Sequence, residues 1–171
     1  MKQFIPPLAI GAVMALAAPA QAAPVAASPS AQAQALILVP LTLTKVDDLD
    51  FGTVISSPIS GTVVIPADGS ARSAAGGVTL VPSDPGLRAR FAGAGSPGRL
   101  VIINATNPGT LSNGLGDTVT ILALTLDGSP IRTIDPTTRA YFFHVGGILQ
   151  INANQAEGLY SAQFDVTAEY L

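Results

Sequence analysis

The chain has 171 residues, enough for one domain with a sizeable hydrophobic core once any export segment is removed. Charged residues make up only 11% and the formal net charge is −3, so the chain lacks the basic face that a nucleic-acid-binding protein needs. Cysteine is absent, which excludes disulfides and a lipid-modified cysteine, and 17 Gly with 14 Pro favour short strands joined by turns over long helices.

The first residues have the pattern of a signal peptide. Lys2 gives a basic start, residues 4–18 are apolar, and Ala20-Gln21-Ala22 fits the small-x-small rule for cleavage after Ala22. The apolar run is short and interrupted by prolines, which disfavours a membrane span. Residues 1–22 are therefore predicted to be removed, leaving an exported protein of the periplasm, cell surface or extracellular space, with no transmembrane segment after cleavage.

Residues 23–34, rich in Ala, Pro, Ser and Gln, carry no charge and no periodicity, and are predicted to form a flexible arm. The domain proper is predicted to comprise residues 35–171. It opens with a strand over residues 35–46, where Pro40 cannot donate a ladder hydrogen bond and indicates an edge position. Four apolar side chains share one face of this strand: Ile37, Val39, Leu41 and Leu43.

Short apolar or alternating runs separated by Gly, Pro and Asp follow at intervals of roughly ten residues. A change of apolar face within residues 118–126 predicts a bulge near Ile121, and Gly146-Gly147 predicts a tight turn or a bulge. Residues 70–77 and 107–116 are predicted loops. In total, about nine or ten short strands are expected, the spacing of an all-β sandwich or barrel. The predicted strands of this region cover residues 49–55, 62–65, 78–81, 87–91, 100–103, 118–126, 131–134 and 139–145, the last resuming after the Gly pair at residues 148–151.

The strongest periodic signal is at the C-terminus. From Gly158 to Leu171, apolar residues occupy alternate positions and polar residues the positions between them, which predicts one long strand with a dry face and a wet face. The larger side chains of the dry face are expected to form core: Tyr160, Phe164, Val166 and Tyr170.

The sequence contains no catalytic signature. Its one histidine, His144, lies in a predicted strand between apolar neighbours, which is more typical of a satisfied side chain than of a general base. Asp47, Asp48 and Asp50 lack the glycine and the terminal glutamate of a calcium loop, and no His/Cys cluster exists. We therefore expect no enzyme activity, no metal and no cofactor.

Three other motifs have ordinary structural explanations. Residues 113–116 are glycine-containing, but no helix is predicted after them to bind a phosphate. Asn104-Ala105-Thr106 matches the N-glycosylation pattern, and the sequence leaves open whether Asn104 is modified. Arg88 and Arg90 share a strand face that is interpreted as solvated rather than as a site for an acidic partner.

Three stretches resemble the landmarks of a bacterial secreted family, domain-of-unknown-function family 4402: residues 49–54, residues 143–149, and Gly158-Leu159-Tyr160 through Tyr170. The resemblance covers residues 35–171. A Gly often stands two residues after the Tyr in that family, whereas this chain has Ala162. The family is similar to pilin-like domains, so the resemblance implies a single antiparallel Ig-like or pilin-like β-sandwich.

The resemblance further implies a non-catalytic subunit of a pilus- or fimbria-like surface fibre, assembled by strand addition with identical or related subunits and a periplasmic assembly chaperone. Ile37, Val39, Leu41 and Leu43 would then be either donated to a neighbouring subunit or used in the first strand of their own domain. The alternative to a fibre subunit is a monomeric secreted or surface module that binds carbohydrate or another surface ligand.

Overall fold

The computed structural model describes residues 29–30 and 32–171. The predicted signal peptide and most of the predicted arm lie outside these described residues. In Ile37–Leu171 the chain forms an all-β unit in which every strand pair is antiparallel, and no helix occurs in this unit. Within the described part of the chain, no helix is long and apolar enough to cross a membrane.

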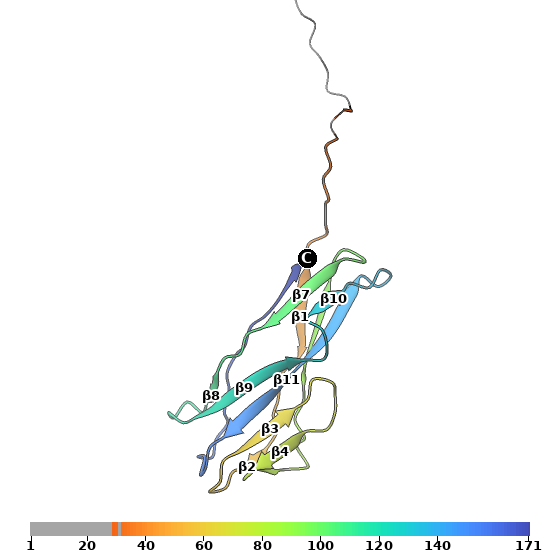
Figure 1. The fold of residues 1–171 in the computed structure, drawn as a ribbon. Helices are drawn as coiled ribbons and strands as arrows, with labels where there is room; N and C mark the ends of the chain where they lie inside the picture. Colours follow the sequence, from red (N-terminus) through yellow and green to blue (C-terminus); the bar gives the residue numbers. More distant parts are fainter. Residues whose placement is uncertain (1–28, 31) are drawn as a thin grey trace, which may run out of the picture. The chain divides into compact units, whose positions relative to one another are not determined.

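The described residues contain twelve strands in three sheets, rather than nine or ten strands in a single sandwich (Figure 1). One sheet has seven strands, a second has the order β10-β7-β12, and a third pairs β2 with β5. The strands are β1 (Thr42–Asp47), β2 (Val54–Ile55), β3 (Gly61–Ile65), β4 (Ser73–Gly76), β5 (Thr79–Leu80), β6 (Ala89–Ala94), β7 (Leu100–Ala105), β8 (Thr110–Ser112), β9 (Thr118–Leu126), β10 (Ile131–Thr133), β11 (Ala140–Ile151) and β12 (Val166–Tyr170).

Strand β11 is the centre of the seven-stranded sheet. Its aromatic and β-branched residues favour a strand, and Tyr141, Phe143 and Val145 are buried while Phe142 between them is exposed. One edge of β11 pairs first with β6 and then with β3, and its other edge pairs with β9. Farther from β11, β6 pairs with β1, β3 pairs with β4, and β9 pairs with β8.

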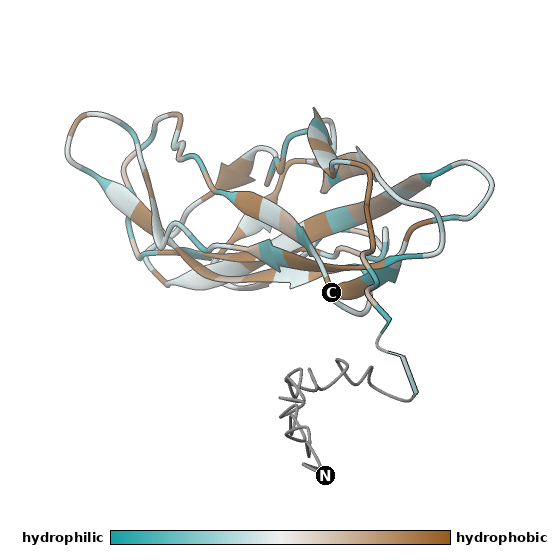
Figure 2. Cartoon of the chain, turned by 90° about the horizontal axis from the view of Figure 1, so that it is seen from above, coloured by the Kyte–Doolittle hydropathy of each residue, from teal (hydrophilic) through white to brown (hydrophobic). Residues whose placement is uncertain are grey.

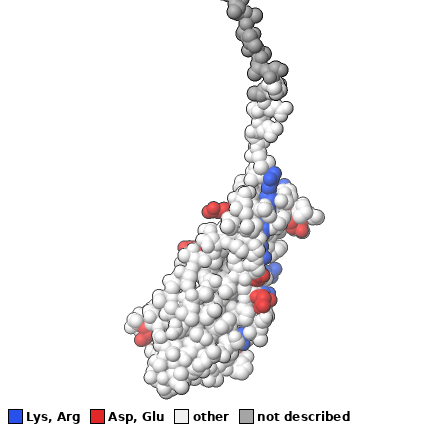
Figure 3. Space-filling view, in the orientation of Figure 1, with Lys and Arg blue, Asp and Glu red and all other residues white. Residues whose placement is uncertain are grey.

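The interior divides into two hydrophobic clusters along β11. The first, which we call the covered cluster, lies between β6 and the first half of β11 on one side and the three-stranded sheet on the other. The second, the open-end cluster, joins residues of β3, β9 and the second half of β11 to Phe51. Figure 2 shows the corresponding alternation of hydrophobic and hydrophilic residues along the strands. Most of the face drawn in Figure 3 carries no charged side chain.

Of the two irregularities that the sequence predicts in this sheet, one is present. The pairing of β9 with β11 skips Leu122, so the bulge predicted near Ile121 is confirmed. The tight turn or bulge predicted at Gly146-Gly147 is wrong, because β11 runs through both residues and pairs with β9 in continuous register from Val145 to Ile148. Glycine is required at Gly146, since a Cβ there would lie 2.2 Å from the carbonyl oxygen of Ile65.

Both predicted terminal strands are too long. β1 begins at Thr42, because its partner β6 ends at Ala94, opposite Thr42, and residues 35–41 have no strand to pair with. As Pro40 suggested, β1 lies at the edge of its sheet. At the other end, only β12 is regular; between Gly158 and Val166 the single ladder contact is a bridge from Ser161 to Ser112.

Two predicted loops contain strands. β4 lies within residues 70–77 and pairs with β3, while β8 lies within residues 107–116 and pairs with β9. Both segments consist mostly of small and polar residues, so no local apolar pattern predicts a strand there. They form strands because an adjacent strand of the same hairpin is available for backbone hydrogen bonds. β7 is central in its sheet as expected, but its outward side chains Leu100 and Ile102 are exposed rather than buried.

The neighbouring residues Phe143 and Phe142 provide a matched test of this core. Phe143 is fully buried and stacks on Phe91 with ring centroids 5.2 Å apart, whereas Phe142 is 54% exposed. Phe143→Ala is expected to lower the free energy of unfolding by about 3–5 kcal/mol, because it opens a cavity. Phe142→Ala is expected to lower it by less than about 1 kcal/mol. Urea unfolding measures both values, and equal losses would contradict the assignment of faces.

Candidate functional site

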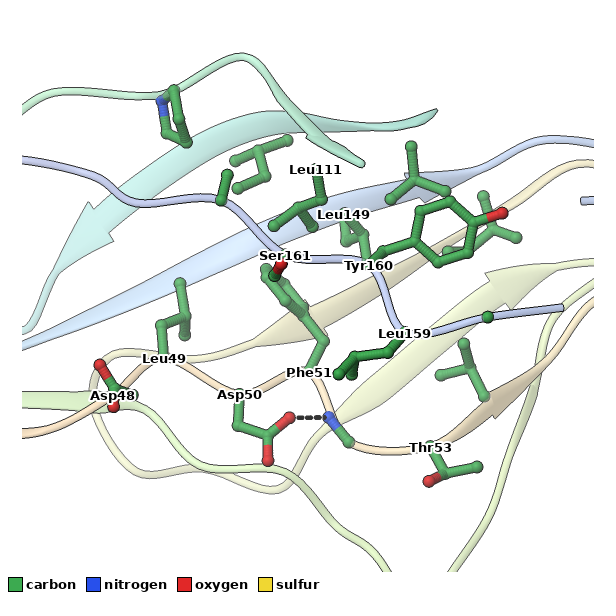
Figure 4. Close-up of a pocket in the computed structure, with 18 of the residues that line it drawn as sticks. Asp48, Leu49, Asp50, Phe51, Thr53, Leu111, Leu149, Leu159, Tyr160 and Ser161 are labelled. Carbon is green, nitrogen blue, oxygen red and sulfur yellow. Dashed lines mark hydrogen bonds between the residues drawn. The ribbon is translucent and has the colours of Figure 1, made fainter. Parts of the chain in front are cut away.

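A cavity of about 1030 Å³ opens over the open-end cluster (Figure 4). Its walls are two segments from distant parts of the chain, residues 45–56 and residues 155–165. We call this cavity the groove and the two segments its rims. Its floor is made by apolar side chains of the seven-stranded sheet: Leu111, Val119, Ile121, Leu149 and Ile151, with Phe91 at one end.

The groove exists because the covering strands do not span the whole of β11. The three-stranded sheet covers the first half, where Phe164, Val166, Ala168 and Tyr170 pack on the covered cluster. Over the second half, the open-end cluster is covered by irregular segments that include Leu49 and Tyr160, and by the short β2–β5 pair. Figure 4 shows Leu49, Asp50 and Phe51 on one rim, with Leu159, Tyr160 and Ser161 on the other.

One end of the groove is closed by hydrogen bonds between the rims. The Ser56 hydroxyl donates to the carbonyl of Gln155 at 3.1 Å, and the Asn154 amide donates to the carbonyl of Ser57 at 2.8 Å. The Tyr160 hydroxyl accepts from the Gln155 side chain and donates to the carbonyl of Ala156, which holds the turn of the second rim. Contacts within the chain therefore fix the position of both rims at this end.

Each rim makes ladder pairing on one side only. Asp50 exchanges two backbone hydrogen bonds with Leu87, of 2.7 and 2.8 Å, and Ser161 exchanges two with Ser112, of 3.0 and 3.1 Å. Both are isolated bridges, and neither rim residue has a second ladder partner among the described strands. A one-sided strand can accept a further strand along its other edge.

The polar groups of the groove are mostly engaged in local turns. The Asp50 carboxylate accepts from the amide of Gly52 at 2.8 Å, and that of Asp84 accepts from the Thr53 hydroxyl at 2.6 Å. This hydrogen bond holds the pKa of Asp84 below its ordinary value of 3.8. Five carboxylates but only one cation, Lys45, line the groove, and that cation pairs with Asp48. The arrangement favours neutral or cationic occupants over anions.

The point where the N-terminal segment joins the body is held by a three-residue contact that we call the tyrosine clasp: Tyr170, Ser96 and Val39. The Tyr170 hydroxyl donates to the Val39 carbonyl at 2.7 Å and accepts from the Ser96 amide at 2.7 Å. The Val39 amide in turn donates to the Ser96 hydroxyl at 2.8 Å. The clasp therefore connects the two ends of the domain through Ser96, which is buried.

Nearby, the hydroxyl of Tyr141 donates to the carbonyl of Thr42 at 3.0 Å, at the start of β1. Burial raises the pKa of Tyr141, and neighbouring Tyr170 adds to the effect, so the hydroxyl keeps its proton and remains a donor. The Tyr141 hydroxyl thus holds the first residue of β1, and the Tyr170 hydroxyl holds Val39 just before the strand.

The four predicted first-strand residues separate into two pairs. Leu41 and Leu43 pack on the covered cluster of their own domain, and β1 pairs with β6 of the same chain. Ile37 and Val39 are exposed, and Ile37 has 91% of its surface accessible. Of the apolar side chains that alternate over residues 37–43, only those from Leu41 onward pack on the core of their own domain.

The four predicted C-terminal core residues all point inward and are partly buried. Phe164, Val166 and Tyr170 pack on the covered cluster, whereas Tyr160 packs on the open-end cluster. Tyr160 and Phe164 also line the groove. β12 pairs with β7 and not with the N-terminal strand, so the tyrosine clasp rather than a ladder connects the chain ends.

The remaining candidate residues have structural partners. His144 Nδ1 lies 2.8 Å from the carboxylate of Asp127, which also contacts Arg132. Arg90 lies 5.8 Å over the ring of Phe142, and Arg88 donates to the carbonyl of Ala67. Asn104 is exposed in β7, and Asn113 folds its own turn by accepting from the amides of Leu115 and Asp117. No cluster of three or more potential metal ligands occurs in the described residues.

The residues that form the groove were not predicted from the sequence. Its floor comes from strands whose alternation indicates only burial, and its rims lie about 100 residues apart in the chain. The one signal of the groove in the sequence was the length of the alternating C-terminal stretch, which exceeds that of any expected partner strand. The residues that cannot pair with such a strand must cover the core irregularly.

Comparison with protein-family models matches residues 41–170 to a family described as "Domain of unknown function (DUF4402)". Neither the curated proteins nor the solved structures contain a match.

The lowered pKa of Asp84 predicts a pH-dependent contribution to stability. A carboxylate whose folded-state pKa lies below 3.8 stabilises the fold above that value, and the contribution is lost as the pH falls through the folded-state pKa. Asp84→Asn is therefore expected to destabilise the protein at pH 7 and to have no effect at a pH below the folded-state pKa. Urea unfolding across this range measures the difference; a penalty that is independent of pH would contradict it.

The tyrosine clasp is tested by Tyr170→Phe, which removes one hydroxyl and leaves the buried amide of Ser96 without its acceptor. We expect a loss of about 1–3 kcal/mol in the free energy of unfolding. Tyr160→Phe is the matched control, expected to cost less because the Ala156 carbonyl is exposed and water can replace the hydroxyl. If both substitutions had the same effect in urea unfolding, the clasp would have no special role.

Proposed function

We propose that this chain, which belongs to the DUF4402 family, is an exported structural subunit of a bacterial surface fibre, assembled by strand addition. In this proposal residues 1–22 are a cleaved signal peptide, and residues 35–171 form an Ig-like or pilin-like sandwich that is incomplete over half of its core. A strand from another subunit fills the groove, and a periplasmic assembly chaperone protects the groove before assembly. The mature protein then lies in the periplasm or on the cell surface.

The observation that carries the proposal is the groove between two one-sided rims. Its apolar floor and the single ladder partners of Asp50 and Ser161 are the two features that an added strand requires. Backbone hydrogen bonds would come from the free rim edges, and specificity from apolar side chains that enter the groove. Nothing in the lining suggests proton transfer: it includes carboxylates, hydroxyls and one lysine, but neither histidine nor cysteine.

A second candidate, a monomeric secreted module that binds carbohydrate or another surface ligand, is favoured by the size of the same groove. A volume of about 1030 Å³ lies at the upper end of the range for small-molecule sites. Tyr160 and Phe51 supply aromatic surface, and the acidic rims supply hydrogen-bond acceptors. The second candidate predicts a stable monomer that binds ligand, so the two candidates differ in the mass of the protein.

The proposal predicts that the mature protein, residues 23–171, forms species heavier than a monomer and that host cells lose a surface filament when its gene is deleted. Light scattering of the purified protein and electron microscopy of the two cell types are the measurements. A stable monomer together with unchanged filaments would overturn the fibre proposal and favour the ligand-binding candidate.

A chain beginning at Val39 is the control for folding. It retains β1 and the tyrosine clasp, so it is expected to unfold in urea with the same cooperativity as residues 23–171. The shortened chain keeps the groove, so a change in its assembly would not be caused by the loss of the acceptor site.

A further inference from the structure

We propose that the strand received by the groove is residues 32–38 of a second copy of this same chain. The inference rests on the proposed function and names its partner, which could otherwise be a different protein. It commits to one segment, one acceptor site and a homotypic contact.

The segment has the side chains that the groove accepts. In an extended conformation Ala33, Ala35 and Ile37 form a wholly apolar face, while the other face is polar at Gln32 and Gln34 and apolar at Leu36 and Leu38. Leu36 is 65% and Ile37 is 91% exposed, so these large apolar side chains are not used by the core of their own domain. Exposed apolar residues next to each other in the chain are typical of an interaction surface.

Charge and length also agree with this occupant. Residues 32–38 carry no charge, which suits a groove bordered by Asp48, Asp50, Glu157 and Asp165 with a single lysine. Seven extended residues span roughly 23 Å. A rim segment of equal length, such as residues 49–55, would lie alongside the whole of it.

The downstream neighbours of the segment cannot take its place. Leu41 and Leu43 are packed on the covered cluster, and Val39 is held by the tyrosine clasp. The donated segment must therefore end at Leu38.

A donor and an acceptor on every copy would give a head-to-tail contact. Such a contact uses two different surfaces and does not close on itself unless the rotation between copies happens to form a ring. One homotypic contact of this kind is sufficient to build a linear fibre from a single subunit type.

The absence of cysteine in the native chain allows a direct test by disulfide cross-linking. Ile37→Cys is combined in the mature chain with Ser161→Cys, an exposed position on the groove rim. The matched control combines Ile37→Cys with Ser129→Cys, an exposed serine in the turn between β9 and β10 that does not line the groove. After mild oxidation, a non-reducing gel is expected to show a ladder of covalent multimers for the first pair and none for the control.

Each outcome has a distinct meaning. A ladder of multimers for the pair Ile37→Cys with Ser161→Cys, and none for the control pair with Ser129→Cys, supports the inference. Heavy assemblies without a ladder would overturn the inference and leave the fibre proposal standing, whereas a monomer by light scattering together with unchanged filaments on the cells would overturn both. A cross-linked monomer that forms independently of protein concentration would show that the segment fills the groove of its own chain, which also overturns the inference.

A second pair of variants keeps the test independent of disulfide geometry. Ile37→Glu puts a carboxylate on the face that enters the acidic groove and is expected to lower the assembled fraction at least tenfold. Gln34→Glu puts the same charge on the opposite face of the segment and is expected to change assembly by less than threefold. Equal loss in both variants, measured by light scattering, would exclude a face-specific insertion and overturn the inference.

Discussion

The structure depends on the double pairing of β11. This strand exchanges backbone hydrogen bonds with β9 along one edge, and with β6 and then β3 along the other. A strand that is paired along both edges fixes the register of its neighbouring strands. The stacked rings of Phe91 and Phe143 in addition hold β6 against the first half of β11. With 12 residues, β11 is also longer than any strand of the three-stranded sheet that covers it, in which β7 has 6.

This difference in coverage produces the groove. Over the first half of β11, β7, β10 and β12 complete a sandwich-like pair of layers around the covered cluster. Over the second half, the chain crosses the core in irregular segments that have only one ladder partner each. An apolar floor under one-sided rims accepts an additional strand, and this is the physical basis of the fibre proposal. The tyrosine clasp separates the residues used inside the domain from those in front of Val39.

Much of the architecture could be predicted from the sequence, because side-chain alternation reports burial directly. Phe164, Val166, Ala168 and Tyr170 all pack on the core as their alternation indicated, and the switch of face in β9 located a bulge. The errors concern strand length and number. Alternation at residues 158–165 and 35–41 suggested ladders, but neither stretch has a partner strand of sufficient length, and β8 offers Ser161 a single residue. Conversely, β4 and β8 form from small and polar residues because a neighbouring strand is available.

The sequence by itself determined that the domain is all-β and that the apolar face of the C-terminal stretch packs on the core, because these properties depend on local periodicity and on Gly and Pro. The tertiary structure alone decided which strands pair, where the covering sheet ends and what remains exposed. The rims of the groove are set by contacts such as Ser56 with Gln155 and Ser161 with Ser112, between residues about 50 to 100 positions apart. Local periodicity contains no information on such pairs, so the candidate site became visible only in the folded chain.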